Sequence, residues 1–186
     1  LIGANGAGKT TFLKILSGIE SYEDTNGQTK FIDDDSIAYI PQVNSLWNNL
    51  TVEQNIILYR KLKLKESKVD ALNNSTWLIE SLNISDKLKR FPSKLSSGEK
   101  QRVAIARAIA SNKNLILLDE ITSNLDFENK TIIQKIINVA IERGKSFLFI
   151  SHDLHFISQF ADQCFVLENA MIKLQKITNY GTYRKF

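Results

Sequence analysis

Apolar residues recur along this chain in two patterns, short unbroken runs and stripes at helical spacing. The runs at residues 36–40, 115–118 and 146–150 predict buried strands. The second run is wholly apolar, as is typical of a central parallel strand that is covered on both faces. Four stripes predict helices: Phe12, Leu13, Ile15, Leu16 and Ile19; Val52, Ile56 and Tyr59; Val103, Ala106 and Ala110; and Ile132, Ile133, Ile136, Ile137, Ala140 and Ile141.

This alternation predicts an α/β fold with a mostly parallel sheet and flanking helices. It is interrupted over residues 45–94, where only helical patterns occur. Thr51 and Gln54 match a capping box at the start of one helix there, and a second helix is expected over residues 66–82. We therefore predict a single domain, 1–186, with an α/β core in 1–44 and 95–186 and a helical subdomain in 45–94.

Local sequence signals predict one further strand, the two ends of a helix and a turn. Weak strand signals occur at residues 29–32, and Asp126 is a good N-cap for the helix after it. Gly144 follows that helix as a C-cap, and residues 169–170 predict a hairpin turn. The chain opens inside the strand that leads into its first loop, so we expect it to be a piece of a longer domain.

Composition narrows the class of protein. The chain has 186 residues, 43% of them hydrophobic and 24% charged, which is ordinary for a globular domain. No apolar run is long enough to cross a bilayer, and the single cysteine together with the lack of a signal peptide favours a reducing cytoplasm. The net charge of +4 does not by itself indicate nucleic acid. The basic stretch 60–68 is interpreted as a solvated helix face, with RNA or acidic lipid as the alternative.

The strongest chemical signal is residues 3–10, Gly-Ala-Asn-Gly-Ala-Gly-Lys-Thr, which match a phosphate-binding loop. Glycines leave room for the backbone to curl around an anion, and the following helix directs N–H groups at it. Lys9 would reach the β- and γ-phosphates, and the Thr10 hydroxyl would bind Mg²⁺. The residues predicted to bind nucleotide here are Asn5, Gly6, Ala7, Gly8, Lys9, Thr10 and Thr11.

Further polar residues follow the predicted strands. Asp119 and Glu120 end the strand at 115–118, and His152 comes just after the strand at 146–150. Nucleotide sites in open α/β sheets lie at the carboxyl ends of the strands. Asp119 is therefore a candidate Mg²⁺ ligand and Glu120 a candidate base that polarises the attacking water.

These motifs resemble those of the ABC-type ATPase family, and the resemblance covers nearly all of the chain. Six of them occur in the family's order: residues 3–10, Gln42, residues 95–99, residues 115–120, residues 123–126 and His152. The resemblance implies that Lys9, Gln42, Glu120 and His152 are catalytic, with Glu120 as general base. It also implies Mg²⁺ ligation by Thr10, Gln42 and Asp119. The signature segment, Ser96, Ser97 and Gly98, with Glu99 beside it, would bind ATP held by a second subunit. Asp126, also predicted at the nucleotide, would help to couple the two sites.

The sequence departs from the family pattern at several positions. Ser97 stands where a second glycine is usual, Glu99 replaces the common Gln, and Ile121 replaces the proline that usually follows the catalytic Glu. The family's amino-terminal antiparallel sheet is missing, together with the aromatic residue that stacks on adenine. No residue of this chain can be assigned that role.

The leading hypothesis is the ATP-binding subunit of a membrane transporter, held at the cytoplasmic face of the membrane by a transmembrane permease on a separate chain. It would work as a homodimer, or as a heterodimer with another ABC ATPase domain, and it would not bind nucleic acid. Val43, Leu46, Trp47 and Leu50 would form the docking surface for the permease. The alternative is a ribosome-associated ABC protein of the translation-factor type. The transported substrate and the direction of transport belong to the permease.

Overall fold

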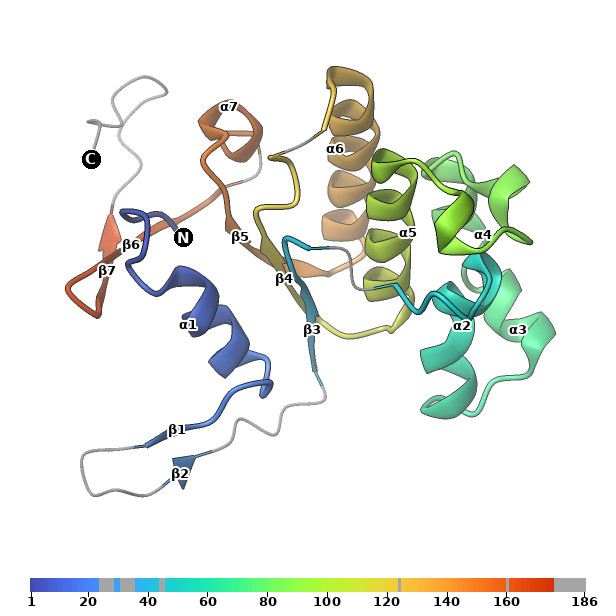
Figure 1. Ribbon diagram of the computed structural model, residues 1–186, viewed down its shortest axis with the longest axis horizontal. Coiled ribbons are helices and arrows are strands. Elements are labelled where there is room, and N and C mark those ends of the chain that lie inside the picture. The colour runs from blue at the N-terminus through green and yellow to red at the C-terminus, as the bar shows by residue number, and fades with distance from the viewer. Residues whose placement is uncertain (24–28, 31–35, 44–45, 124, 160, 176–186) are drawn as a thin grey trace.

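Three parallel strands form the centre of the computed structural model (Figure 1). They are β3 (Ile37–Ile40), β4 (Leu115–Asp119) and β5 (Ser146–Ile150), in the order β3-β4-β5. The structure describes residues 1–23, 29–30, 36–43, 46–123, 125–159 and 161–175. The three predicted strands are confirmed, and the most apolar of them is the central one.

Alternate residues of β4 face two different layers of helices. Ile116 and Leu118 pack with α5 (Ser97–Ala110) and α6 (Phe127–Glu142), whereas Leu117 packs with α1 (Lys9–Leu16) on the other face. All three side chains are at most 1% exposed. Helices therefore cover both faces of the sheet, as the unbroken apolar pattern of this strand predicts (Figure 1).

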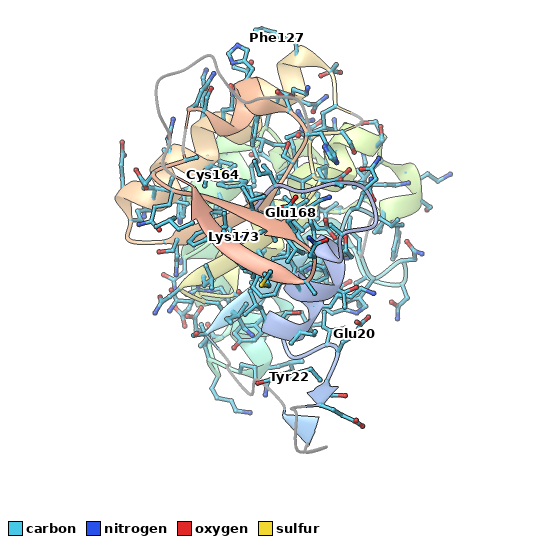
Figure 2. All side chains as sticks on the ribbon, turned by 90° about the vertical axis from the view of Figure 1, so that its left-hand side faces the viewer. Glu20, Tyr22, Phe127, Cys164, Glu168 and Lys173 are labelled. Atoms are coloured by element: carbon cyan, nitrogen blue, oxygen red, sulfur yellow. The ribbon has the colours of Figure 1, made fainter. Side chains whose placement is uncertain are left out.

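The first residues of the chain lie between β5 and a hairpin. The Leu1 nitrogen donates to Phe149 O, and Ile2 pairs in parallel with Val166. Val166 lies in β6 (Cys164–Glu168), which pairs with β7 (Met171–Gln175) in the hairpin seen face-on in Figure 2. The turn residues Asn169 and Ala170 have φ of 49° and 58°, which confirms the predicted turn.

The remaining small elements lie outside both the three-stranded parallel sheet and the β6–β7 hairpin. A short antiparallel pair is formed by β1 (Tyr22–Glu23) and β2 (Thr29–Lys30), and α7 (Leu154–Ile157) follows β5. The weak strand signal is thus confirmed at 29–30, while residues 31–32 lie outside the described part of the chain. The N-cap role of Asp126 is confirmed, since its Oδ1 accepts from Asn129 N at 2.8 Å.

The described residues from 46 to 94 form helices and no strand. The helix α2 (Val52–Leu62) packs on α5 and is followed by four short pieces. The Thr51–Gln54 capping box is present in full, with bonds of 2.9 and 3.3 Å. The pieces after α2 are α3 (Lys68–Asn73), α4 (Thr76–Ser81) and the 3-10 turns η1 (Ser85–Lys87) and η2 (Pro92–Lys94). One apolar cluster joins these helices to the sheet.

The prediction of one continuous helix over residues 66–82 is wrong. It is broken between α3 and α4 at Asn74 and Ser75. Ser75 is fully buried and its Oγ donates to Ala71 O at 2.7 Å, so the side chain competes with the helical backbone pattern. Val69, expected on the buried stripe, is 66% exposed.

Two other predictions about the helices need correction. The first helix ends at Leu16, and Gly18 with φ 71° turns the chain away, so Ile19 is 61% exposed instead of buried. The basic stretch 60–68 is not a uniform solvated face, because Arg60 is held by Glu66 in a two-bond ion pair.

Candidate functional site

The loop over residues 3–8 is shaped by its glycines. A Cβ on Gly3 would lie 2.5 Å from Leu167 O, so the loop approaches β6 more closely than a side chain permits. Gly6 and Gly8 have φ of 79° and 92°, in the left-handed region that glycine adopts without strain. Gly8 is also the N-cap of α1, so the loop runs directly into the helix.

Lys9 is held at the centre of this loop. Its side chain is 7% exposed, and Nζ donates to Gly3 O and Ala4 O at 2.9 Å each. The N–H groups of the first turn of α1 have no acceptor within the helix, and among the described residues no side chain caps this end. Thr10 and Thr11 are exposed there. The arrangement offers N–H donors, a hydroxyl and an ammonium to an anion.

A cavity of about 600 Å³ lies beside the loop. Its lining is the loop on one side and the β6–β7 turn on the other, from Gly3 to Ala7 and from Val166 to Ala170. This volume is in the range of small-molecule sites.

Asp119 and Glu120, the acidic pair, lie at the carboxyl end of β4. Asp119 is 2% exposed, and its Oδ2 accepts from the Tyr39 hydroxyl at 3.1 Å. Burial and the neighbouring Asp119 carboxylate raise the pKa of Tyr39, so this hydroxyl stays protonated and donates. Sequence reasoning missed Tyr39, although the signal was available: it is the third residue of the strand that ends just before Gln42.

Glu120 brings together side chains from three strand ends. Its Oε2 accepts from Gln42 Nε2 at 3.2 Å, and its Oε1 lies 3.2 Å from His152 Nε2. These residues follow β3, β4 and β5, whose carboxyl ends lie at one edge of the sheet. Glu120 also has φ 49°, an unusual value for a residue with a side chain. Gln42 and His152, both predicted to be catalytic, thus contact the carboxylate of Glu120, the predicted base.

The predicted signature segment, residues 96–98, forms the start of α5. The Ser96 Oγ accepts from Glu99 N at 3.2 Å, and Glu99 Oε2 accepts from Ser96 N at 2.8 Å. These bonds form a capping box that sequence reasoning did not identify here, although the Ser-x-x-Glu spacing matches it. Ser96 and Ser97 are exposed, whereas Gly98 is buried.

A second cavity, of about 300 Å³, lies between the signature segment and the acidic pair. Its lining includes Ser97, Gln42 and Glu120, and it shares no lining residue with the cavity beside the phosphate loop. Asp126 is exposed, and hydrogen bonds from the Asn129 backbone and side chain lower the pKa of its carboxyl. It is thus an ionised group at the surface near α5 and α6.

Comparison with known proteins identifies the family. The sequence model of the ABC transporter family matches residues 1–123. The chain belongs to the ABC transporter family. It is 33% identical over 187 aligned positions to the arginine transport ATP-binding protein ArtM of Bacillus subtilis. This alignment covers 92% of this chain and 76% of ArtM. It is also 33% identical to the lipoprotein-releasing system ATP-binding protein LolD of Buchnera aphidicola, with coverage of 92% and 81%.

Solved structures of the family have the same fold. An ATP-binding subunit of an ABC transporter superposes with a TM-score of 0.77 at 25% identity, covering 93% of this chain and 76% of the other. This ABC protein is therefore the ATP-binding and ATP-hydrolysing domain of a transporter. The relatives are transport ATP-binding proteins, so the alternative of a ribosome-associated translation factor is not supported. None of the described helices is both long and apolar enough to span a membrane.

Proposed function

We propose that ATP is hydrolysed at the edge of the sheet where Glu120 meets Gln42 and His152. The observation that carries this proposal is the Glu120 carboxylate, which lies 3.2 Å from a side-chain nitrogen of each. Glu120 accepts the proton of the attacking water, and Gln42 and His152 hold its two oxygens in place. Lys9 and the first turn of α1 bind the phosphates.

Mg²⁺ would be held by Thr10, Gln42 and Asp119. A hydroxyl, an amide oxygen and a carboxylate are the hard oxygen ligands that this ion prefers, completed by phosphate oxygens and water. Among the described residues, no group of three or more His, Cys, Asp and Glu side chains is arranged to hold a metal ion by itself. When bound there, the ion would neutralise part of the phosphate charge. The buried Asp119, oriented by Tyr39, offers its carboxylate at the required edge.

The variant Glu120→Gln tests the base in the complete protein. It keeps the size of the side chain and removes its ability to accept a proton, so we expect ATP to bind while turnover falls at least ~100-fold. Binding of a fluorescent ATP analogue and steady-state phosphate release measure the two effects. Glu128→Gln, on the exposed first turn of α6, is the matched control. Unchanged turnover in Glu120→Gln would remove Glu120 from this role.

For the permease, we propose a docking groove of about 290 Å³ between α1, β3, α2 and α5. Trp47 lines it and is 45% exposed, while its backbone is fixed by Asn55 through bonds of 2.9 and 3.1 Å. The Arg107 guanidinium lies 4.6 Å from the centre of the indole. A rigidly held aromatic residue beside a cation is typical of an interface anchor.

Of the four apolar residues expected at the docking surface, only Trp47 lines this groove. Val43 is 79% exposed but is not part of the lining, and Leu46 is 8% exposed and packs in the core. Trp47→Glu should therefore reduce co-purification with the permease and transport-coupled turnover, with no loss of ATP binding. Phe91→Glu is the control, because Phe91 is 46% exposed and lies outside the groove lining. If both variants keep the complex intact, the groove is not the docking site.

We further propose that two copies, or one copy and a related domain, work head to tail at the cytoplasmic face of the membrane. Within one chain the signature segment does not line the cavity beside the phosphate loop, so the loop covers only one side of a nucleotide. A second subunit's signature segment would close the site and exclude water from the γ-phosphate. Ser96 and Ser97 are exposed and accessible for that contact.

A further inference from the structure

Gly98 of the signature segment has no room for a side chain within its own chain. A Cβ built on Gly98 would lie 2.6 Å from Asn129 Nδ2 and 2.7 Å from both Asn129 Cγ and Oδ1. Real Cβ contacts are essentially never this short. Gly98 also lies inside the regular first turn of α5, so no left-handed backbone conformation requires glycine here. A side chain at Gly98 would thus displace the Asn129 side chain from its place.

Asn129 also holds the neighbouring Asp126. Its backbone N–H and its Nδ2 both donate to Asp126 Oδ1, at 2.8 and 2.9 Å. Its Oδ1 is buried and has no hydrogen-bond partner among the described residues. Such an unpaired oxygen costs free energy, so a polar residue here needs a reason beyond packing. The one amide group thus touches Gly98 on α5 and fixes Asp126 at the start of α6.

We propose that Asn129 is a positioning residue that sets the spacing between the signature segment and Asp126. Its amide occupies the space next to Gly98 and donates a hydrogen bond to the carboxylate of Asp126. In the proposed two-copy arrangement the signature segment contacts the second subunit's nucleotide and Asp126 helps to couple the two sites, so the consequence for turnover rests on that proposal. A shift of about 1 Å in such groups is enough to lower a rate by about 100-fold.

A double-mutant cycle in the full-length protein with its permease tests the contact. Gly98→Ala should lower the melting temperature by roughly 5 °C, because the added methyl group forces Asn129 aside. Asn129→Ala removes all three crowding atoms. In the double variant the methyl group is accommodated, so the melting temperature should return at least to the value of Asn129→Ala. A double variant that melts no higher than Gly98→Ala overturns the proposal.

A second variant separates positioning from packing. Asn129→Leu keeps a branched side chain of similar shape next to Gly98. It removes the side-chain hydrogen bond to Asp126 and the unpaired oxygen, while the backbone hydrogen bond to Asp126 remains. We expect its melting temperature to be equal to or above that of the parent, with kcat lowered by roughly 10-fold and KM unchanged. An unchanged kcat overturns the positioning role.

These readouts remain distinct from the proposed function. The melting temperatures report the contact in the absence of ATP. If Glu120→Gln turns over at the parent rate, the proposed catalytic edge fails while the melting data still decide whether Asn129 excludes a side chain at Gly98.

Discussion

Two helix N-termini, those of α1 and α5, are directed at nucleotide in the proposed mechanism, and they are capped in different ways. Gly8 begins α1 and supplies no side chain, and Lys9 adds a positive charge. At α5, Ser96 and Glu99 cap each other through two hydrogen bonds. The first N-terminus leaves its N–H groups for an anion, whereas the second has its own carboxylate beside it.

This difference indicates that the two ends bind phosphate in different circumstances. The backbone N–H of Ser96 holds the pKa of Glu99 below its usual value, so the carboxylate stays ionised at neutral pH and opposes a free anion. We infer that α1 captures ATP and that α5 meets only a nucleotide that another subunit already holds. The following experiments test this division of roles, from the largest expected effect to the smallest.

Removing the cation at α1 should have the largest effect. Lys9→Ala should lower turnover at least ~100-fold, since losing one donor to transition-state charge typically costs that much. Lys14→Ala is the control, because Lys14 lies on the same helix and only pairs at the surface with Glu20 at 2.8 Å. Phosphate release measures both variants. Equal turnover in the two would show that α1 is not the capturing end.

The second test uses mixtures of two inactive proteins, Lys9→Ala and Ser97→Asp. Ser97 is exposed, so the added carboxylate repels a phosphate from the second subunit without disturbing the core. In a head-to-tail pair, mixed dimers place both lesions in one site and neither in the other, so part of the activity should return. Heterodimers that stay inactive would mean that the two sites hydrolyse ATP only together, or that each site is not built from both subunits. Full activity in dilute, strictly monomeric parent protein would exclude the two-copy arrangement.

Removing the α5 cap should have a smaller effect. Ser96→Ala should destabilise the protein by about 1 kcal/mol through loss of the N-cap acceptor. Ser67→Ala removes a comparable cap from α3, where Ser67 Oγ accepts from Asp70 N at 3.1 Å far from the site. Both variants should melt a few degrees lower, by roughly 3 °C. If Ser67→Ala lowers turnover as much as Ser96→Ala, then general stability explains the loss and the α5 end has no special role.

The smallest effect concerns pH. Because the folded state lowers the pKa of Glu99, its contribution to stability is present above the unfolded value of 4.5 and is lost as pH falls through the folded pKa. The stability difference between the parent and Glu99→Gln should therefore shrink below about pH 4.5. Urea unfolding at several pH values measures it. A difference that grows on acidification would mean that the carboxylate is not stabilised by the cap.

Features encoded within a few consecutive residues could be predicted from the sequence. The capping box at Thr51 and the N-cap at Asp126 depend on hydrogen bonds that span three positions, and the Lys9 side chain bonds to the phosphate loop five and six positions before it. The central strand depends on its unbroken apolar run. The order of motifs was sufficient to indicate the family. Turn and cap chemistry is local, so spacing alone specifies it.

Other features were decided only by tertiary packing. The helix over 66–82 is interrupted because Ser75 is buried and bonds back to Ala71, and Leu46 packs in the core instead of facing a partner. The pairing of Gln42 and His152 with Glu120 joins residues 78 and 32 positions away from it. The contact between Gly98 and Asn129 depends on how α5 crosses α6. Local spacing cannot encode such contacts, because they depend on the distance and angle at which separate elements pack.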